Sequence, residues 1–81
     1  MIEKEKPALG AQEAVLGAML IEPKVVPAIL RKVTAEDFTD ATCRNVFNAF
    51  VKLIAASKHI DAVTVLGVLG SEYRQYLGEL M

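Results

Sequence analysis

The stretch DATCRNVFNAFVKLIAA, residues 40–56, decides the fold class. Asp40 is the best helix N-cap in the sequence, because an aspartate carboxylate accepts hydrogen bonds from backbone N–H groups of a first helical turn. Apolar residues then recur at the three- and four-residue spacing that places them on one face of a helix. We predict a helix over residues 41–56, the longest in the chain. Its expected buried face comprises Val46, Phe47, Phe50, Val51 and Ile54.

Upstream, a second helix is predicted from Ala11 until Pro23 ends it. Its buried stripe comprises Val15, Leu16, Met19 and Leu20. Glu13 lies in the first turn, where it complements the positive end of the helix dipole. Gly17 costs about 1 kcal/mol relative to alanine in a helix interior. We therefore expect another part of the backbone to approach Gly17 closely.

Two interpretations of residues 23–32 stay open, because Pro27 cannot lie inside a regular helix without the loss of a hydrogen bond. Either residues 23–26 form an isolated turn, or a helix begins near Pro27 and runs to about residue 32. The expected buried residues of that helix are Ile29, Leu30 and Val33.

The segment from Thr34 to Asp37 has the spacing of a capping box, with aspartate where glutamate is more usual. We expect it to start a single short turn that presents Phe38 to the core.

Downstream, residues 57–59 interrupt the helical pattern and Asp61 predicts a new N-cap. The expected buried stripe of the helix that follows comprises Val63, Leu66 and Leu69. Gly70 is expected to end this helix with a positive φ angle. Ser71 is expected to cap a last helix over residues 72–80. No stretch shows the alternating pattern of a strand, so we predict an all-α fold: a single small globular bundle of five to six short helices.

The composition fits one domain. The chain has 81 residues, 53% of them hydrophobic, and at this length a fold buries roughly 60% of the surface of the unfolded chain. Residues 1–6 alternate in charge and are expected to form a flexible leader ahead of a domain over residues 7–81. No apolar run reaches the ~18–20 residues of a membrane span, which excludes a membrane-spanning protein.

Charge and cysteine content narrow the function classes. The net charge is −1, which argues against a surface built to hold a phosphate backbone. A single cysteine, Cys43, cannot form an intramolecular disulfide, so a reducing, intracellular setting is expected.

The sequence predicts no catalytic, cofactor or metal site. Two interpretations of Cys43 and His59 stay open. The two residues form a reactive dyad, or Cys43 is a small apolar filler of the core and His59 is a solvated loop residue. One histidine and one cysteine are too few for a closed zinc site, and no glycine-rich motif that cradles phosphates is present. We expect that this chain is not an enzyme, with a small enzyme built around Cys43 as an alternative.

Residues 61–80 read as helix, glycine turn and helix, the order found in helix-turn-helix DNA-binding domains. The second helix offers Arg74 and Gln75 but also Glu72 and Glu79, and acidic side chains are repelled by the phosphates of DNA. We expect no specific DNA binding and keep a small helix-turn-helix domain as the alternative function.

Protein interaction is the remaining class. A hydrophobic content this high in so short a chain leaves apolar surface outside the core, and such surface marks partner sites. Tyr73 and Tyr76 lie three residues apart on one predicted helix, and tyrosine is enriched at interfaces. The alternative for both is a half-buried core position with the hydroxyl in water.

Five short motifs occur in one order along residues 7–81. They are GAQEAVLG at 10–17 with Met19 and Leu20, AEDF at 35–38, Val46 with Phe47, KHID at 58–61 with VTV at 63–65, and YLGEL at 76–80. In this order and spacing the chain resembles the N-terminal domain of DnaB-type bacterial replicative DNA helicases. It departs from that family at Gly10 and Gln12, where acidic residues are usual, and at Cys43, where histidine is usual.

The resemblance implies a helical head that contributes to the collar of a homohexameric helicase during DNA replication. It implies self-association by dimer pairing, docking of the C-terminal domain of primase and of a helicase loader in some systems, and a cytoplasmic location at the bacterial replication fork. ATP and Mg²⁺ are expected only in a separate C-terminal motor domain. In isolation the head is expected to be a monomer or weak dimer. The expected partner-facing residues are Gln12, Glu13, Tyr73 and Tyr76.

Overall fold

The computed structural model describes residues 9–81. The helices are α1 (Leu9–Ile21), α2 (Val26–Leu30), α3 (Ala41–Ala55), α4 (Ala62–Leu69) and α5 (Arg74–Leu80); three 3₁₀ turns are η1 (Pro23–Val25), η2 (Ala35–Asp37) and η3 (Ser71–Tyr73). No strand occurs in this part of the chain, and the predicted all-α class is confirmed. The expected leader over residues 1–6 lies outside the described residues.

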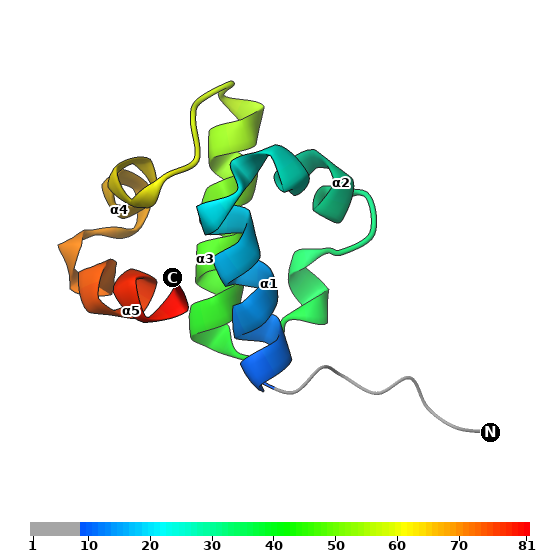
Figure 1. Ribbon diagram of the computed structural model, residues 1–81, viewed down its shortest axis with the longest axis horizontal. Helices are drawn as coiled ribbons and strands as arrows, with labels where there is room; N and C mark the ends of the chain where they lie inside the picture. The colour runs from blue at the N-terminus through cyan, green and yellow to red at the C-terminus, as the bar shows by residue number, and fades with distance from the viewer. Residues whose placement is uncertain (1–8) are drawn as a thin grey trace.

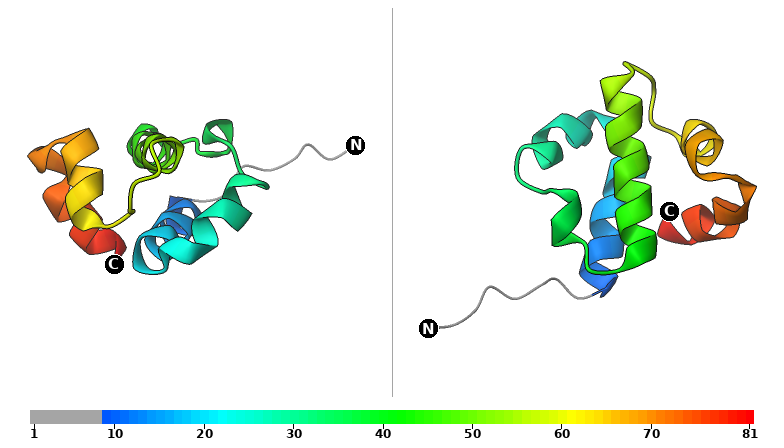
Figure 2. Two further views of the ribbon diagram at one scale, coloured as in Figure 1. Left: turned by 90° about the horizontal axis from the view of Figure 1, so that it is seen from above. Right: turned by 180° about the vertical axis from the view of Figure 1, so that it is seen from behind.

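The two longest helices, α1 and α3, lie side by side and run in the same direction (Figure 1). On one side of this pair lie α2 and η2, and on the other lie α4 and α5, as the view from behind also shows (Figure 2). The end of α5 returns to α1, so the chain closes around one core. Among residues 9–81, no helix combines the length and the hydropathy that crossing a membrane requires.

The predicted caps are confirmed where they depend on local spacing. The Asp40 carboxylate accepts a hydrogen bond from the Cys43 N–H at 3.0 Å and starts α3. The Thr34 N–H donates to the Asp37 carboxylate at 2.8 Å and starts η2. At α4, the Thr64 N–H donates to Asp61 at 2.8 Å. Each cap fixes where its element begins because it satisfies a backbone group that has no partner within the helix.

The core is centred on α3. The largest fully buried side chains are Phe50, Leu16, Met19, Leu77, Val26, Val46, Val65 and Cys43. Each of the five helices within residues 9–81 therefore contributes to the core. Phe38 is buried after η2, as predicted, and its ring lies 4.8 Å from that of Phe47, measured between centroids. This tilted aromatic pair joins the turn η2 to the middle of α3.

The predicted buried faces were wrong at three positions. On α3, Val51 and Ile54 are each 38% exposed, and Leu53 is buried instead. On α4, Val63 is 79% exposed, whereas Val65 is fully buried. In helices this apolar, the spacing of apolar residues allows several faces, and packing against neighbouring helices selects one of them.

Three backbone predictions are resolved by the structure. Pro27 is the second residue of α2, a position where its missing N–H costs no hydrogen bond. Residues 23–25 form a separate turn ahead of this helix. The predicted isolated turn and the predicted helix near Pro27 are therefore both present. Gly70 has a φ of 105° and ends α4, as predicted. Ser71 is not an N-cap: its side chain makes no capping bond, because the positive φ of Gly70 leads into η3 and α5 begins only at Arg74.

The close approach predicted at Gly17 is confirmed. A Cβ atom at Gly17 would overlap the backbone carbonyl oxygen of Leu80. The absence of a side chain therefore allows the end of α5 to lie directly against α1.

Candidate protein-interaction surface

Gln12 is 2% exposed, which contradicts its predicted partner-facing position. Its side-chain oxygen accepts hydrogen bonds from the backbone N–H groups of Thr39 at 3.1 Å and Asp40 at 3.3 Å. Its side-chain nitrogen donates to the Thr39 hydroxyl at 2.9 Å. The amide joins α1 to the loop before α3, because these backbone donors precede the helix and have no other helical partner. Gln12 is thus a structural residue.

Glu13, Tyr76 and Cys43 form a chain of hydrogen bonds that joins α1, α5 and α3. The Tyr76 hydroxyl donates to Glu13 Oε2 at 3.0 Å, and its oxygen lies 3.2 Å from Cys43 Sγ. In this second contact either the thiol or the hydroxyl can donate the hydrogen bond. Both Glu13 and Tyr76 remain half-buried, so each keeps an edge at the surface.

The electrostatics of this chain oppose nucleophilic chemistry. Burial raises the pKa of the Cys43 thiol, and although the bond to Tyr76 lowers it, Asp40 and Glu13 raise it further. Burial also raises the pKa of Tyr76, with the bonds to Cys43 and Glu13 acting in the same direction. Both groups therefore stay protonated at neutral pH, whereas a reactive cysteine requires the thiolate.

Cys43 and His59 are not brought together. Cys43 lies in the first turn of α3, and His59 lies in the exposed loop that follows the other end of that helix. At 1.5 Å per residue, α3 rises about 18 Å from Cys43 to its last residue, Ala55. Residues 9–81 also hold no group of three or more side chains suited to a metal ion.

Tyr73 lies in η3, half-buried against the core. Its hydroxyl accepts a hydrogen bond from the Asn45 side-chain amide at 3.0 Å. The hydroxyls of Tyr73 and Tyr76 thus both form hydrogen bonds within the protein. The alternative prediction of half-buried positions is therefore confirmed, but its expectation that the hydroxyls bond to water alone is wrong. Glu13, Tyr73 and Tyr76 together offer half-buried edges of polar and aromatic character, a composition suited to contact with another protein.

The sequence predicted apolar surface outside the core but did not place it on α1. The outward side of α1 carries only small or aliphatic residues: Gly10, Ala11, Ala14, Ala18 and Ile21 are all exposed. Ile21 is 62% exposed. The signal was present in the sequence, since residues 14–21 contain no polar side chain. A helix that is apolar all round is usually covered on every side.

Residues 4–81 match the DnaB-like helicase N terminal domain family. The chain belongs to this family. Residues of this DnaB-like domain are 41% identical, over 58 positions, to the replicative DNA helicase DnaB of Rhodothermus marinus. That match covers 72% of this chain and 6% of the relative.

The fold of this DnaB-like domain also matches a solved relative. The crystal structure of the N-terminal domain of DnaB helicase from Mycobacterium tuberculosis superposes with a TM-score of 0.80 at 30% identity. The match covers 95% of this chain and 58% of that one. The predicted resemblance is confirmed: residues 4–81 form a DnaB-like helicase N-terminal domain. They therefore belong to this domain and not to an ATPase motor.

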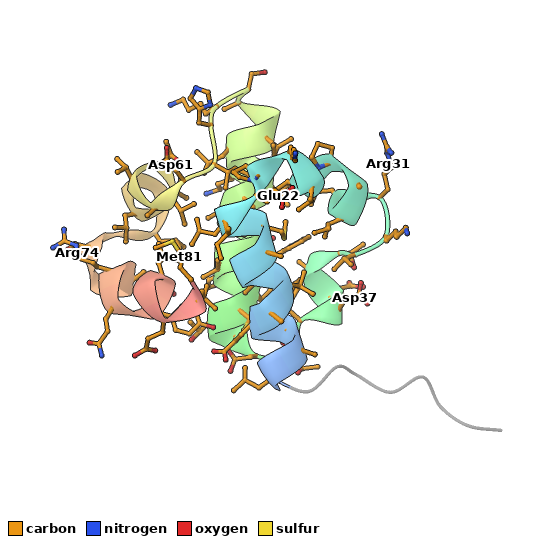
Figure 3. The ribbon with its side chains drawn as sticks, in the orientation of Figure 1. Glu22, Arg31, Asp37, Asp61, Arg74 and Met81 are labelled. Atoms are coloured by element: carbon orange, nitrogen blue, oxygen red, sulfur yellow. The ribbon has the colours of Figure 1, made fainter. Side chains whose placement is uncertain are left out.

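The helix-turn-helix alternative gains no support from the geometry. The would-be recognition helix α5 has seven residues and follows a 3₁₀ turn. Arg74 at its start points away from the bundle (Figure 3), but Glu72 and Glu79 are exposed beside it. Acidic side chains at this position would face the phosphates of DNA.

Proposed function

We propose that this domain is a protein-interaction and assembly module of a replicative helicase. In this role it pairs with other copies in the collar of a homohexamer and docks the C-terminal domain of primase, and a helicase loader where one is used. ATP and Mg²⁺ belong, in this proposal, to a motor domain outside residues 4–81. The observation that carries the proposal is membership of the DnaB-like N-terminal domain family over nearly the whole chain.

Two properties of the surface support this role. The outward side of α1 is uncharged; it comprises residues 10, 11, 14, 18 and 21. An interface would bury this apolar surface away from water, which is favourable. Elsewhere on the surface, Glu13, Tyr73 and Tyr76 combine a carboxylate with aromatic edges. Aromatic residues held in place by their own hydrogen bonds contribute to binding at low cost in conformational entropy.

The proposal is tested by titrating the C-terminal domain of primase from the same organism into this chain by calorimetry. Saturable binding is expected, and no binding at low and moderate salt would refute primase docking. Light scattering of the isolated chain is expected to give a monomer or weak dimer, because one helix face is much smaller than the ~1,000 Å² of a stable interface. A tight hexamer of the isolated chain would contradict that expectation.

Variants locate the partner-facing residues. Glu13→Gln keeps an oxygen acceptor for the Tyr76 hydroxyl and removes the charge, and Tyr73→Ala removes an aromatic edge whose own hydrogen bond is exposed. Both are expected to weaken primase binding or self-association. Glu22→Gln, on an exposed glutamate that pairs with Lys24, is the matched charge control. If Glu13→Gln and Tyr73→Ala both leave primase binding and self-association unchanged, the surface formed by Glu13, Tyr73 and Tyr76 is not the contact site.

A further inference from the structure

A shallow pocket of about 190 Å³ lies between α3 and α4. It borders the hydrogen bond between Asn45 and Tyr73. It is lined by Asn45, Asn48, Ala49, Lys52, Val68 and Leu69. Positions 45, 48, 49 and 52 fall on one face of α3 because neighbours on a helix surface are three and four residues apart. A cavity of about 150 Å³ holds a benzene molecule, so this pocket has room for one apolar side chain.

The walls of the pocket differ in chemistry from its floor. Ala49 and Leu69 are buried or half-buried and Val68 is exposed at the rim, so the floor is apolar. Asn48 and Lys52 are exposed, and within residues 9–81 their side chains make no hydrogen bond or ion pair. The pocket thus joins an apolar floor to an unpaired ammonium and an unpaired amide.

No acidic residue lines the pocket. The Asn45 amide already donates to Tyr73, so Lys52 and Asn48 are the groups open to a ligand. A lysine ammonium and an asparagine N–H₂ both donate hydrogen bonds to a carboxylate. Nucleic acid fits less well, because phosphate backbones are held by several cations rather than one.

We propose that this α3–α4 pocket docks an acidic segment of a partner protein, with an apolar side chain on the floor and the neighbouring carboxylate on Lys52 and Asn48. This inference deepens the proposed function, on which it rests, by naming a second contact surface and the chemistry that it recognises. Charge complementarity sets the orientation of such a contact more than its affinity.

The first experiment uses a small probe and needs no partner protein. 4-Methylpentanoate, an apolar chain with a carboxylate, is titrated into ¹⁵N-labelled protein, in parallel with 4-methylpentanamide and inorganic phosphate. Saturable shifts are expected at Asn48, Lys52 and Leu69 with the carboxylate alone. Lys52→Gln is expected to weaken this binding about fivefold, and Lys58→Gln, on an exposed lysine outside the pocket, is expected to leave it unchanged. No shift at these residues, or an equal response to the amide or to phosphate, would overturn the assignment.

The second experiment separates the pocket from the proposed function. Lys52→Glu is expected to weaken binding of the primase C-terminal domain about tenfold by placing a like charge against the partner, and Lys58→Glu is the matched control. Equal binding by wild type and Lys52→Glu would overturn primase as the occupant of the pocket while primase docking itself stands. If primase binds no version of the chain, the proposed docking fails, and the titration with 4-methylpentanoate still decides whether the pocket takes an apolar carboxylate.

Discussion

Replacing Gly17 with alanine is expected to destabilise the domain, although alanine is normally the better residue in a helix. Gly17 lies in the interior of α1, and a Cβ atom there would overlap the carbonyl oxygen of Leu80. This neighbour is backbone, so it cannot rotate away as the end of a flexible side chain would. The whole end of α5 must move, and the buried side chain of Leu77 moves with it.

The magnitude follows from two opposing effects. Over-packing of a well-packed site costs about 1–3 kcal/mol, and a rigid neighbour places Gly17→Ala in the upper half of this range, at about 2–3 kcal/mol. Against this, alanine is favoured over glycine in a helix interior by about 1 kcal/mol. The expected net loss of unfolding free energy is therefore about 1–2 kcal/mol. In a domain of this size, each kcal/mol lowers the melting temperature by roughly 4–8 °C.

Two other glycines provide matched controls. At Gly67 in α4 and Gly78 in α5, a Cβ atom would have no neighbouring atom within 4 Å, so Gly67→Ala and Gly78→Ala are expected to stabilise the domain by up to about 1 kcal/mol. Urea unfolding followed by far-ultraviolet circular dichroism measures all three variants. Stabilisation by Gly17→Ala equal to that of the controls would refute the expected clash, because α5 would then not lie against α1.

Three further predictions concern buried or capping side chains. Gln12→Leu is expected to lower the unfolding free energy by about 2 kcal/mol, because it leaves the N–H groups of Thr39 and Asp40 without their acceptor. Urea unfolding measures this loss of stability, and a loss below about 0.5 kcal/mol would contradict the prediction. Cys43 is expected to react with iodoacetamide only as the protein unfolds, because its thiol is buried and its pKa is raised; fast labelling of the native protein would contradict this. A backbone hydrogen bond lowers the pKa of Asp61 below its ordinary 3.8. The stability from this cap is therefore present above about pH 4 and is lost as the pH falls through the lower folded value; in an acid titration, Asp61→Asn should lose part of this pH dependence, and an identical acid profile would contradict the role of the cap.

The elements of this fold could be predicted because their limits depend on nearby residues. Asp40 and Asp61 bond to N–H groups three residues ahead, so the sequence contains both partners of each cap within one turn. The positive φ of Gly70 is likewise a property of one residue. The buried faces were less predictable. Val63 and Val65 have identical side chains, and the packing of α4 against its neighbours leaves one exposed and buries the other.

The candidate site was harder to predict because its contacts join distant parts of the chain. Gln12 bonds to residues 27 and 28 positions away, and a polar residue near a helix start is ordinarily a surface residue. Tyr76 meets Glu13 across 63 positions and Cys43 across 33. Neither pair leaves a periodic pattern in the sequence. The resemblance to the helicase domain identified the function class, but the roles of these side chains required the fold.

The polar groups of α1 explain why this helix presents an apolar side to the solvent. α1 has only two polar side chains, Gln12 and Glu13. One is buried on the loop before α3 and the other holds the Tyr76 hydroxyl. Since both serve contacts within the domain, no polar side chain remains for the outward side. An isolated surface helix normally carries charge there. A helix whose polar side chains are all engaged internally is best accommodated when another chain covers its outer side. The proposed collar of repeated subunits would supply such a cover.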